Sequence, residues 1–262
     1  MFAEERRQRI LDAVRAQGRV RLPDLVEMLG VTEPTIRKDL SDLHDRRLLR
    51  RTHGGAIAVE PRLEQTLHDR GGQHRDAKRR IAEACRAEIR RGASVFLDSG
   101  TTVQAIAEGL EPLDLNILTN ALGVAHAVAA RPGLRHTLLG GTVRPLGGSL
   151  VGPIALETLA RFTVDVAFIG ASGLTEDGIS VADVAEAQLK QAVIDRARRV
   201  VAPMDSSKFG AADFVTVCPL DRLDLIITEH PTDDAARWCH DHGVELRTAE
   251  DSKFDGQARM AR

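Results

Sequence analysis

The chain has 262 residues, of which 43% are hydrophobic and 28% are charged, and its formal net charge is −2. This length suits one small and one larger globular domain, and the near-neutral charge neither favours nor excludes a nucleic-acid partner. No run approaches the roughly 18 apolar residues that span a bilayer, and the charged N-terminus lacks the apolar stretch of a secretory signal. Three separate cysteines without a CxxC pair exclude a disulfide framework and suit the reduced cytoplasm, where we expect the protein to act.

Charge is distributed unevenly along the chain. Residues 1–56 hold 12 Lys and Arg and 9 Asp and Glu, a net of +3, and the whole chain carries −2, so the remainder carries −5. A basic segment followed by an acidic body is typical of a DNA-binding domain attached to a domain that does not touch DNA. We therefore predict a DNA-binding domain at 1–56, a linker at 57–75 and a second domain at 76–262.

Three short helical patterns open the sequence. Apolar residues at helical spacing predict one helix over 4–16, a second over about 22–29, and a third that runs from Thr32, the expected N-cap, to about Leu43. The second and third helices are joined by a tight turn after Gly30, which is the arrangement of a helix-turn-helix. The following stretch LLRRTHGGAIAV is strand-like, is broken by a glycine pair, and predicts a β-hairpin wing.

The third predicted helix has the two-sided character of a recognition helix. Ile36, Leu40 and Leu43 fall on one side, where they are expected to pack on the first two helices, so polar and basic residues occupy the other side. Such side chains bond base edges and phosphates in the major groove, and basic wing residues add phosphate contacts. The predicted DNA-contacting residues are Thr32, Thr35, Arg37, Lys38, Ser41, Arg50, Arg51 and His53. The spacing alone also fits a small helical bundle with a basic face.

The stretches GVTEPTIRKDL and RTHGGA resemble the winged helix-turn-helix of DeoR-type repressors. In that family a recognition helix with TIRRDL is followed by a leucine-rich stretch and a basic HGGA wing, and all three features recur here together. Lys38 stands where the family usually has arginine, which keeps the charge but loses the bidentate contact to a base. The resemblance implies a double-stranded DNA operator as partner. Because such domains read two half-sites with two copies, we expect a homo-oligomer, either a dimer or a tetramer.

The C-terminal part has the alternating pattern of an α/β domain. Residues 57–75 are polar, carry Pro61 and two adjacent glycines, and are typical of a linker. After them, helical patterns alternate with expected strands at SVFLD, LNILTN, LRHTLLG, VDVAFIG, RRVVAP, FVTVC and LDLIIT. A closing helix and strand are expected at DDAARWCHDH and VELRT. This alternation predicts a mainly parallel sheet.

The sequence VFLDSGTTVQAIAEGL places a glycine turn between a strand and a helix. The strand is expected to end at Asp98, and the helix to begin near Thr101 and Thr102, after Ser99 and Gly100. The free N–H groups and dipole of the helix start, together with the hydroxyls, attract a phosphate group. No G-K-[ST] follows and no GxGxxG occurs in the chain, so a nucleotide is not favoured. Taken alone, the segment also fits an ordinary capped turn.

Four more segments carry polar residues at expected strand ends or on one helix face. They contribute Thr119, Asn120, Gly140, Gly141, Arg144, Ser149, Asp183, Glu186, Lys190, Asp205 and Lys208. Since ligands of open parallel sheets bind at the carboxyl ends of the strands, this placement favours a shared site. Each segment also has a plain explanation of its own. Glu186 and Lys190, for example, have the spacing of a solvated ion pair worth about 0.3 kcal/mol.

In their order along the chain, these segments resemble the blocks of the C-terminal sensor domain of DeoR-type repressors, over roughly residues 76–230. That domain is similar in fold to ribose-5-phosphate isomerase and glucosamine-6-phosphate deaminase, and in the family it binds phosphorylated sugars as inducers. The resemblance implies that Ser99–Thr102 hold the phosphate and that Lys208 is a second cation. It also implies that sugar hydroxyls are bonded by Asp98, Asn120, Asp183, Glu186 and Lys190.

Two other functions fit parts of the sequence. A sugar-phosphate isomerase or deaminase fused to a DNA-binding domain would use the carboxylates and Lys190 as acid–base groups. No histidine lies in any of these blocks, so no His–carboxylate relay can be assembled from them. A DNA-binding module with a purely oligomerising body would bind no phosphorylated metabolite. We expect a repressor of sugar or polyol catabolism genes that is not an enzyme and is relieved by a phosphorylated sugar or polyol.

We expect neither a cofactor nor a metal. Cys239, His240 and His242 form a C-H-D-H cluster that at first suggests metal ligands. Adjacent residues at one helix end cannot all face the same ion, so a surface helix terminus is the favoured interpretation.

Overall fold

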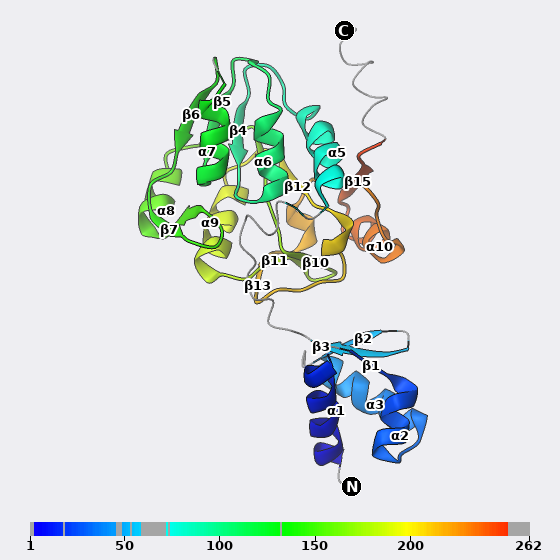
Figure 1. Cartoon of the computed structure of the whole chain (residues 1–262). Helices are drawn as coiled ribbons and strands as arrows, with labels where there is room; N and C mark the ends of the chain where they lie inside the picture. The colour runs from blue at the N-terminus through cyan, green and yellow to red at the C-terminus, as the bar shows by residue number, and fades with distance from the viewer. Residues whose placement is uncertain are drawn as a thin grey trace. The chain divides into compact units, whose positions relative to one another are not determined.

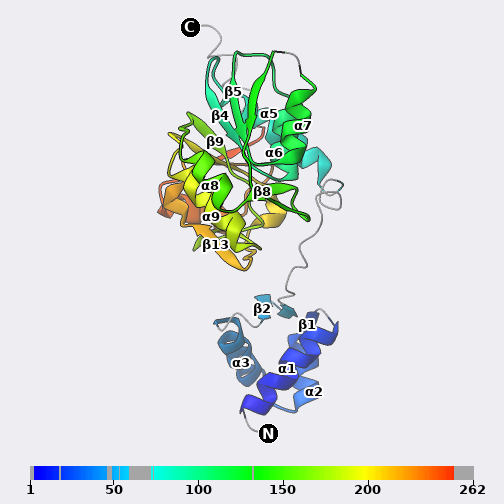
Figure 2. The same cartoon turned by 90° about the vertical axis from the view of Figure 1, so that its left-hand side faces the viewer.

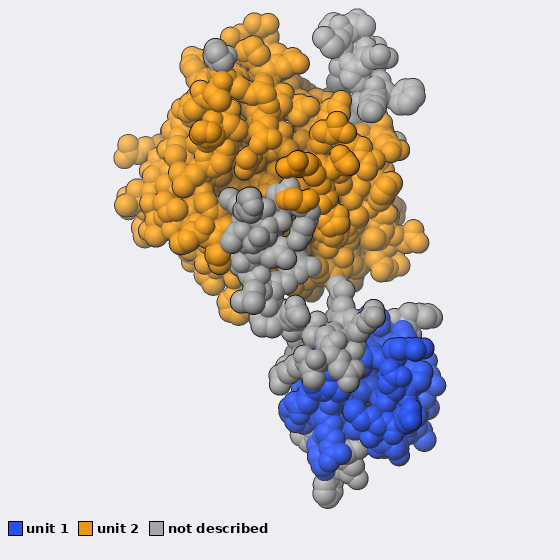
Figure 3. Space-filling model, viewed as in Figure 1, with its two compact units in different colours: residues 1–63 blue, residues 64–262 orange. Residues whose placement is uncertain are grey.

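The computed structural model describes residues 3–17, 19–45, 49–52, 54–58, 72, 74–131 and 133–250. The chain divides into two compact units, residues 1–63 and 64–262, which have separate colours in Figure 3. Most of the predicted linker, at 59–71 and 73, lies outside the described residues, as does the tail 251–262. Within the described ranges, every helix is too short or too polar to cross a membrane.

Three helices and a three-stranded antiparallel sheet make up the described part of the N-terminal unit (Figure 1). The helices are α1 at Ala3–Gln17, α2 at Leu22–Leu29 and α3 at Glu33–Asp45. The strands, in the spatial order β1-β3-β2, are β1 at Arg19–Arg21, β2 at Leu49–Thr52 and β3 at Gly55–Ala58. The predicted helix-turn-helix and its hairpin wing are therefore confirmed. The short strand β1, which pairs with β3, was not predicted because three residues are too few to show a period.

Apolar residues of the three helices meet in one core. Ile10 of α1, Leu25 of α2, and Ile36 and Leu43 of α3 are each at most 1% exposed. The apolar side of α3 thus faces inward, as its spacing predicted. Gly30 ends α2 with a φ of 63° and donates its N–H to the carbonyl oxygen of Val26. This left-handed conformation suits glycine and makes the tight turn to α3 possible.

A buried carboxylate fixes α3 against α1. Asp39 is 2% exposed and accepts hydrogen bonds from Nε of Arg6 at 2.5 Å and from Nε of Arg7 at 3.1 Å. Arg7 also pairs with Asp42, one turn further along α3. Since Asp39 lies on the helix predicted to enter DNA, these contacts set the orientation of its exposed side.

A seven-stranded parallel sheet lies at the centre of the described part of the C-terminal unit. Its spatial order is β15-β14-β12-β9-β4-β5-β6, and neighbouring strands pair in parallel. In this order the strands span Glu245–Thr248, Leu225–Thr228, Val200–Pro203, Val166–Phe168, Ser94–Leu97, Asn116–Thr119 and Arg135–Leu138. The predicted α/β class is confirmed.

Helices cover both faces of this sheet (Figures 1 and 2). On one face, Val95 and Leu97 of β4 belong to the core that contains α5, α6 and α7. On the other face, Phe96 belongs to the core that contains α8, α9 and α10. The helices are α5 at Arg75–Arg86, α6 at Thr101–Glu108, α7 at Leu122–Ala129, α8 at Pro153–Leu159, α9 at Val184–Ile194 and α10 at Asp233–Asp241.

Two antiparallel elements accompany the sheet. The hairpin of β7, Thr142–Arg144, and β8, Ser149–Val151, follows β6. A small sheet joins β10 at Gly173–Thr175, β11 at Gly178–Val181 and β13 at Val215–Cys218. The segment FVTVC was expected in the parallel sheet, but as β13 it pairs antiparallel with β11. A four-residue apolar strand carries no signal for its partner, and β12 and β14 pair directly with each other, which leaves no place between them. Two 3₁₀ turns, η1 at Ser206–Lys208 and η2 at Leu220–Arg222, complete the described elements.

Replacing Asp39 is predicted to loosen the recognition helix. In Asp39→Ala, two partly buried guanidinium groups lose their carboxylate, a loss of about 2 kcal/mol of local stability. Hydrogen exchange of the full chain, followed by mass spectrometry, is expected to show that the protection factors of α3 amides fall about thirtyfold. This factor corresponds to about 2 kcal/mol. Asp42→Ala is the matched control, because Asp42 is 34% exposed and, within the described ranges, has Arg7 as its ion-pair partner. Equal losses of protection in the two variants would contradict the role of Asp39.

Candidate functional site

The order of strands along the chain reverses beside β4. After β4 the chain adds β5 and β6 on one side, and then returns to β9, β12, β14 and β15 on the other. The carboxyl ends of strands beside such a reversal are where open α/β sheets bind ligands. A pocket lies at this position, between the loops that follow β4, β9 and β12 and the first turn of α5. The predicted residues that line it are Ser99, Gly100, Thr101, Thr102, Glu186, Asp205 and Lys208.

The turn after β4 forms one wall of the pocket. Gly100 is the N-cap of α6 and has a φ of 127°, a backbone conformation that L side chains rarely adopt. Ser99 is 6% exposed, and Thr101 and Thr102 are half-buried at the start of the helix. The amide groups of a first helical turn have no partner within the helix, so this wall presents donors and hydroxyls to an anion.

Lysines from two other elements line the same pocket. Lys208 belongs to η1, after β12, and Lys78 lies on the first turn of α5. Lys78 is 7% exposed. It was not among the predicted site residues, because a lysine in a charged amphipathic helix is usually solvated. The sequence did contain a sign that Lys78 is buried. Lys78 lies on the same side of the helix as buried Ile81 and Cys85, which follow three and seven residues later.

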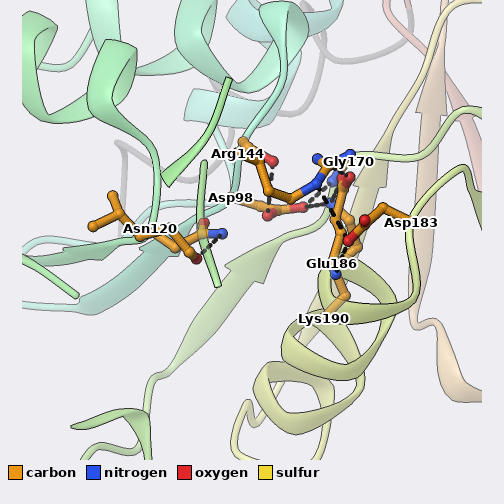
Figure 4. Close-up of polar contacts among 9 residues, drawn as sticks. Asp98, Asn120, Arg144, Gly170, Asp183, Glu186 and Lys190 are labelled. Atoms are coloured by element: carbon orange, nitrogen blue, oxygen red, sulfur yellow. Dashed lines mark hydrogen bonds and ion pairs between the residues drawn. The ribbon is translucent and has the colours of Figure 1, made fainter. Parts of the chain in front are cut away.

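A buried chain of charges adjoins the pocket (Figure 4). Lys190 pairs with Asp98 and, at 3.1 Å, with Glu186, and the side chains of Lys190 and Asp98 are 2% and 1% exposed. Arg144 donates to Glu186 at 2.6 Å and lies 3.2 Å from Asp183. The alternative explanation of Glu186 and Lys190 as a solvated ion pair is wrong, because their side chains are only 13% and 2% exposed. Lys190 reaches Asp98 at the end of β4 and Glu186 reaches Arg144 of β7, so α9 turns both side chains inward.

Burial and charge act in opposite directions on Lys190. Burial alone lowers the pKa of this ammonium group, but the carboxylates of Asp98 and Glu186 outweigh burial and raise the pKa above its ordinary value. Lys190 therefore stays charged. Asp98 also accepts a hydrogen bond at 2.9 Å from the N–H of Gly170, which follows β9. These contacts tie the ends of β4 and β9 to α9. Asp98 and Lys190 therefore form an ion pair with each other and do not line the open pocket.

Several predicted residues have structural contacts of their own. The hydroxyl of Thr119 donates to the carbonyl oxygen of Leu97 at 2.6 Å and accepts from the N–H of Ala121, and Thr119 is fully buried. Asp183 caps α9 by accepting from the N–H of Glu186 at 2.8 Å. Asp205 caps η1 by accepting from the N–H of Ser207.

Five further predicted residues are not part of the pocket lining. These are Asn120, Gly140, Gly141, Arg144 and Ser149. Gly141 has a φ of 133°, and a Cβ there would lie 2.6 Å from the carbonyl oxygen of Val151, so its role is to allow the hairpin to pack closely. The residue of this hairpin that does line the pocket is Gly147, which was not predicted.

The outer side of α3 carries the predicted DNA contacts. Arg37 is 51% exposed and pairs with Glu33 at 2.5 Å, and Lys38 is exposed. On the wing, Arg51 donates to the hydroxyl of Ser41 at 3.2 Å, which brings a wing arginine to the recognition helix.

At the start of α3, the hydroxyls of Thr32 and Thr35 are 3.0 Å apart, and the carbonyl oxygen of Thr32 accepts from the N–H of Thr35. His53 lies outside the described residues, as does the side chain of Arg50.

The C-H-D-H segment does not converge on one point. Cys239 is 1% exposed, whereas His240 and His242 are exposed at the end of α10. Across the part of the chain that the structure describes, no three His, Cys, Asp or Glu side chains are grouped to hold a metal ion.

Comparison with known proteins covers both units. The family described as a DeoR-like helix-turn-helix domain matches residues 6–62, and the DeoR C terminal sensor domain matches residues 73–230. The chain is 33% identical to the glycerol-3-phosphate regulon repressor of Escherichia coli, over 94% of this chain and 99% of that one. It is 32% identical to the transcriptional repressor GlcR of Bacillus subtilis, over 95% and 98% of the two chains.

It is also 34% identical to the transcriptional regulator GlpR of Haloferax volcanii, over 99% of this chain and 100% of that one. Among solved structures, ribose 5-phosphate isomerase A from Methanocaldococcus jannaschii is similar with a TM-score of 0.39 and 18% identity, over 52% of this chain and 55% of that one. The matches to both domains and the full-length relatives show that the chain belongs to the DeoR family of transcriptional regulators.

Proposed function

We propose that this chain represses genes of sugar or polyol catabolism and leaves its operator when a phosphorylated sugar or polyol occupies the pocket after β4, β9 and β12. The observation that carries the proposal is the meeting of the Ser99–Thr102 turn with Lys78 and Lys208 in one pocket. Helix N–H groups, hydroxyls and ammonium groups are the partners that phosphate prefers in proteins. The E. coli relative is named for a glycerol-3-phosphate regulon, which supports this ligand class.

DNA binding is assigned to the N-terminal unit. Its recognition helix exposes Arg37 and Lys38 and is anchored on its inner side by Asp39, so the outer side is free to enter a major groove. Arg51, held beside Ser41, is placed to contact phosphate next to the helix. Two copies of the unit would read two half-sites, which supports a homo-oligomer as the active form.

The charge chain supports a sensor rather than an isomerase or deaminase. A general base needs a carboxylate that reaches the substrate and is not held by a neighbouring cation. Asp98 is 1% exposed and paired with Lys190, and Glu186 is paired with both Lys190 and Arg144. Incubation with ribose 5-phosphate or glucosamine 6-phosphate is therefore expected to give no turnover, and turnover above the uncatalysed rate would favour the enzyme.

Base reading by Arg37 is tested with the full chain and an operator selected from random DNA by that chain. Arg37→Ala is expected to weaken binding of the selected operator by about 5- to 150-fold, or about 1–3 kcal/mol. Arg9→Ala is the matched control, because Arg9 is also exposed and also paired with a glutamate one turn away, but lies on α1. Fluorescence anisotropy measures both. Equal effects of Arg37→Ala and Arg9→Ala would contradict the assigned recognition surface.

Phosphate binding is tested with Thr101→Ala combined with Thr102→Ala. The probes are inorganic phosphate, glycerol 3-phosphate, ribose 5-phosphate, glucose 6-phosphate and fructose 1-phosphate. A probe at 100 times its dissociation constant stabilises the native chain by about 2.7 kcal/mol, which a thermal-shift assay detects. The double variant is expected to lose roughly 150-fold in affinity, or about 3 kcal/mol, because two hydroxyl donors to a charged group are removed.

The control is Thr137→Ala combined with Thr142→Ala, which removes two exposed hydroxyls from the neighbouring strands β6 and β7. This control is expected to keep the full thermal shift, and the variant with Thr101→Ala and Thr102→Ala is expected to keep its operator affinity. Full ligand affinity in the Thr101 and Thr102 double variant would rule out the proposed site. The absence of a thermal shift of the unchanged protein with any of the five probes would also rule it out.

A further inference from the structure

A second groove lies at the opposite edge of the parallel sheet from the proposed phosphate pocket. Its lining comes from residues at the amino ends of β4, β9, β12 and β15. Gly92 and Ala93 of this lining precede β4, whereas the turn Ser99–Thr102 follows it. The chain from Ala93 to Ser99, six steps of about 3.3 Å each, spans about 20 Å, so the two sites are separate. The groove has a volume of about 670 Å³, within the range of small-ligand sites.

Arginines dominate the lining of this groove, which we call the arginine groove. It contains five arginines and three acidic residues, an excess of two positive charges. They are Arg90, Arg91, Arg198, Arg199 and Arg247, and Glu88, Asp165 and Glu245. Residues 57–262 together carry a net charge of −5, so the groove is a positive region on an acidic domain. A concave surface with an excess of one charge attracts ions of the opposite sign, and the groove therefore favours anions.

Two of the arginines are held in place by carboxylates of the groove. Glu88 is 7% exposed and pairs with Arg247 at 2.6 Å and with Arg199 at 3.2 Å. Glu245 also pairs with both guanidinium groups. Even so, Nε of Arg199 is buried and has no hydrogen-bond partner in the described part of the chain. Since buried polar groups are almost always paired, this donor indicates that the cluster is incomplete without a further acceptor.

The other three arginines receive little compensation within the groove. Arg90 is exposed and has no hydrogen bond or ion pair among the described residues. Arg198 lies 3.8 Å from Asp165, and 77% of its side chain is exposed. Arg91 pairs at 2.7 Å with Asp114, which is not part of the groove lining. Exposed pairs of this kind stabilise a fold by less than about 1 kcal/mol. Because the gathered like charges repel one another, an anion bound between them would stabilise the arrangement.

We propose that the arginine groove is a second ligand site, which binds a small polyanion with two or more closely spaced phosphoryl or carboxylate groups. Guanidinium groups present planar N–H donors that match both kinds of anionic oxygen, often with two parallel hydrogen bonds. The excess of two positive charges in the lining suits a ligand with at least two negative charges. This site goes beyond the proposed function and does not depend on it, because the two sites share no residue.

The competing explanation is a solvated cluster of ion pairs that joins the starts of the strands and binds no ligand. Arg90 and Arg198 distinguish the two explanations, because neither of them contacts the buried carboxylate of Glu88. Their removal leaves the paired part of the cluster intact. A ligand site then loses affinity for polyanions, whereas a structural cluster has no such affinity to lose.

The test uses the full chain with Thr101→Ala and Thr102→Ala, so that the pocket after β4 contributes little to anion binding. Isothermal titration with pyrophosphate and with citrate distinguishes the phosphoryl from the carboxylate class. The tighter of the two probes is expected to bind with a dissociation constant below about 1 mM. The further changes Arg90→Ala and Arg198→Ala are expected to weaken its binding at least about tenfold, because two charged donors are removed.

The matched control adds Arg135→Ala and Arg161→Ala to the same background. Both arginines are exposed and line neither site, so the control removes the same charge elsewhere and is expected to change the affinity less than about twofold. Equal losses in the two variants would show that only net charge matters and would overturn the second site. Dissociation constants above about 1 mM for both probes would overturn it as well. Either result leaves the proposed function standing, because the thermal shifts of the unchanged protein with monophosphates test that function separately.

Discussion

The buried pair of Lys190 and Asp98 is the interaction on which the sensor unit depends. It places two full charges where 1–2% of each side chain is exposed, an arrangement that is stable only while both partners are present. The pair joins the end of β4 to α9, and Glu186 extends it to Arg144 and the hairpin. Three elements far apart in the sequence are thereby held around the strand ends. The turn Ser99–Thr102, which we propose holds the phosphate, directly follows Asp98.

The turn that we propose holds the phosphate was predictable because its sequence signal is local. A strand, a glycine and a run of hydroxyls stand together in VFLDSGTT, and the structure places Ser99–Thr102 on the pocket wall. The recognition helix was predictable for the same reason, since Ile36, Leu40 and Leu43 fix its inner side by spacing alone. Short-range patterns therefore predicted the local structure of both candidate surfaces, the turn after β4 and the recognition helix.

The contacts that orient these surfaces were not predictable, because their partners are far apart in the sequence. Asp39 meets Arg6 and Arg7 across more than thirty residues, and Asp98 meets Lys190 across ninety-two. The identity of an acidic residue or a lysine does not show whether it is exposed or buried. Lys78 and Glu186 were therefore not recognised as buried or half-buried groups. The strand β13 shows the same limit for backbone pairing, as four apolar residues do not specify a partner.

We propose that one chain carries two sites, one for operator DNA and one for the effector, whose occupancies oppose each other. Linkage requires that an effector which weakens operator binding is itself bound more weakly, by the same factor, when the operator is present. The decisive measurement is an isothermal titration of the tightest phosphorylated compound into the full chain, with and without saturating operator DNA. We expect the dissociation constant to rise by about 5- to 150-fold with operator, matching the loss of operator affinity measured with saturating effector. Equal dissociation constants in the two titrations would show that effector and operator bind independently, which contradicts the proposed release of the operator by the effector.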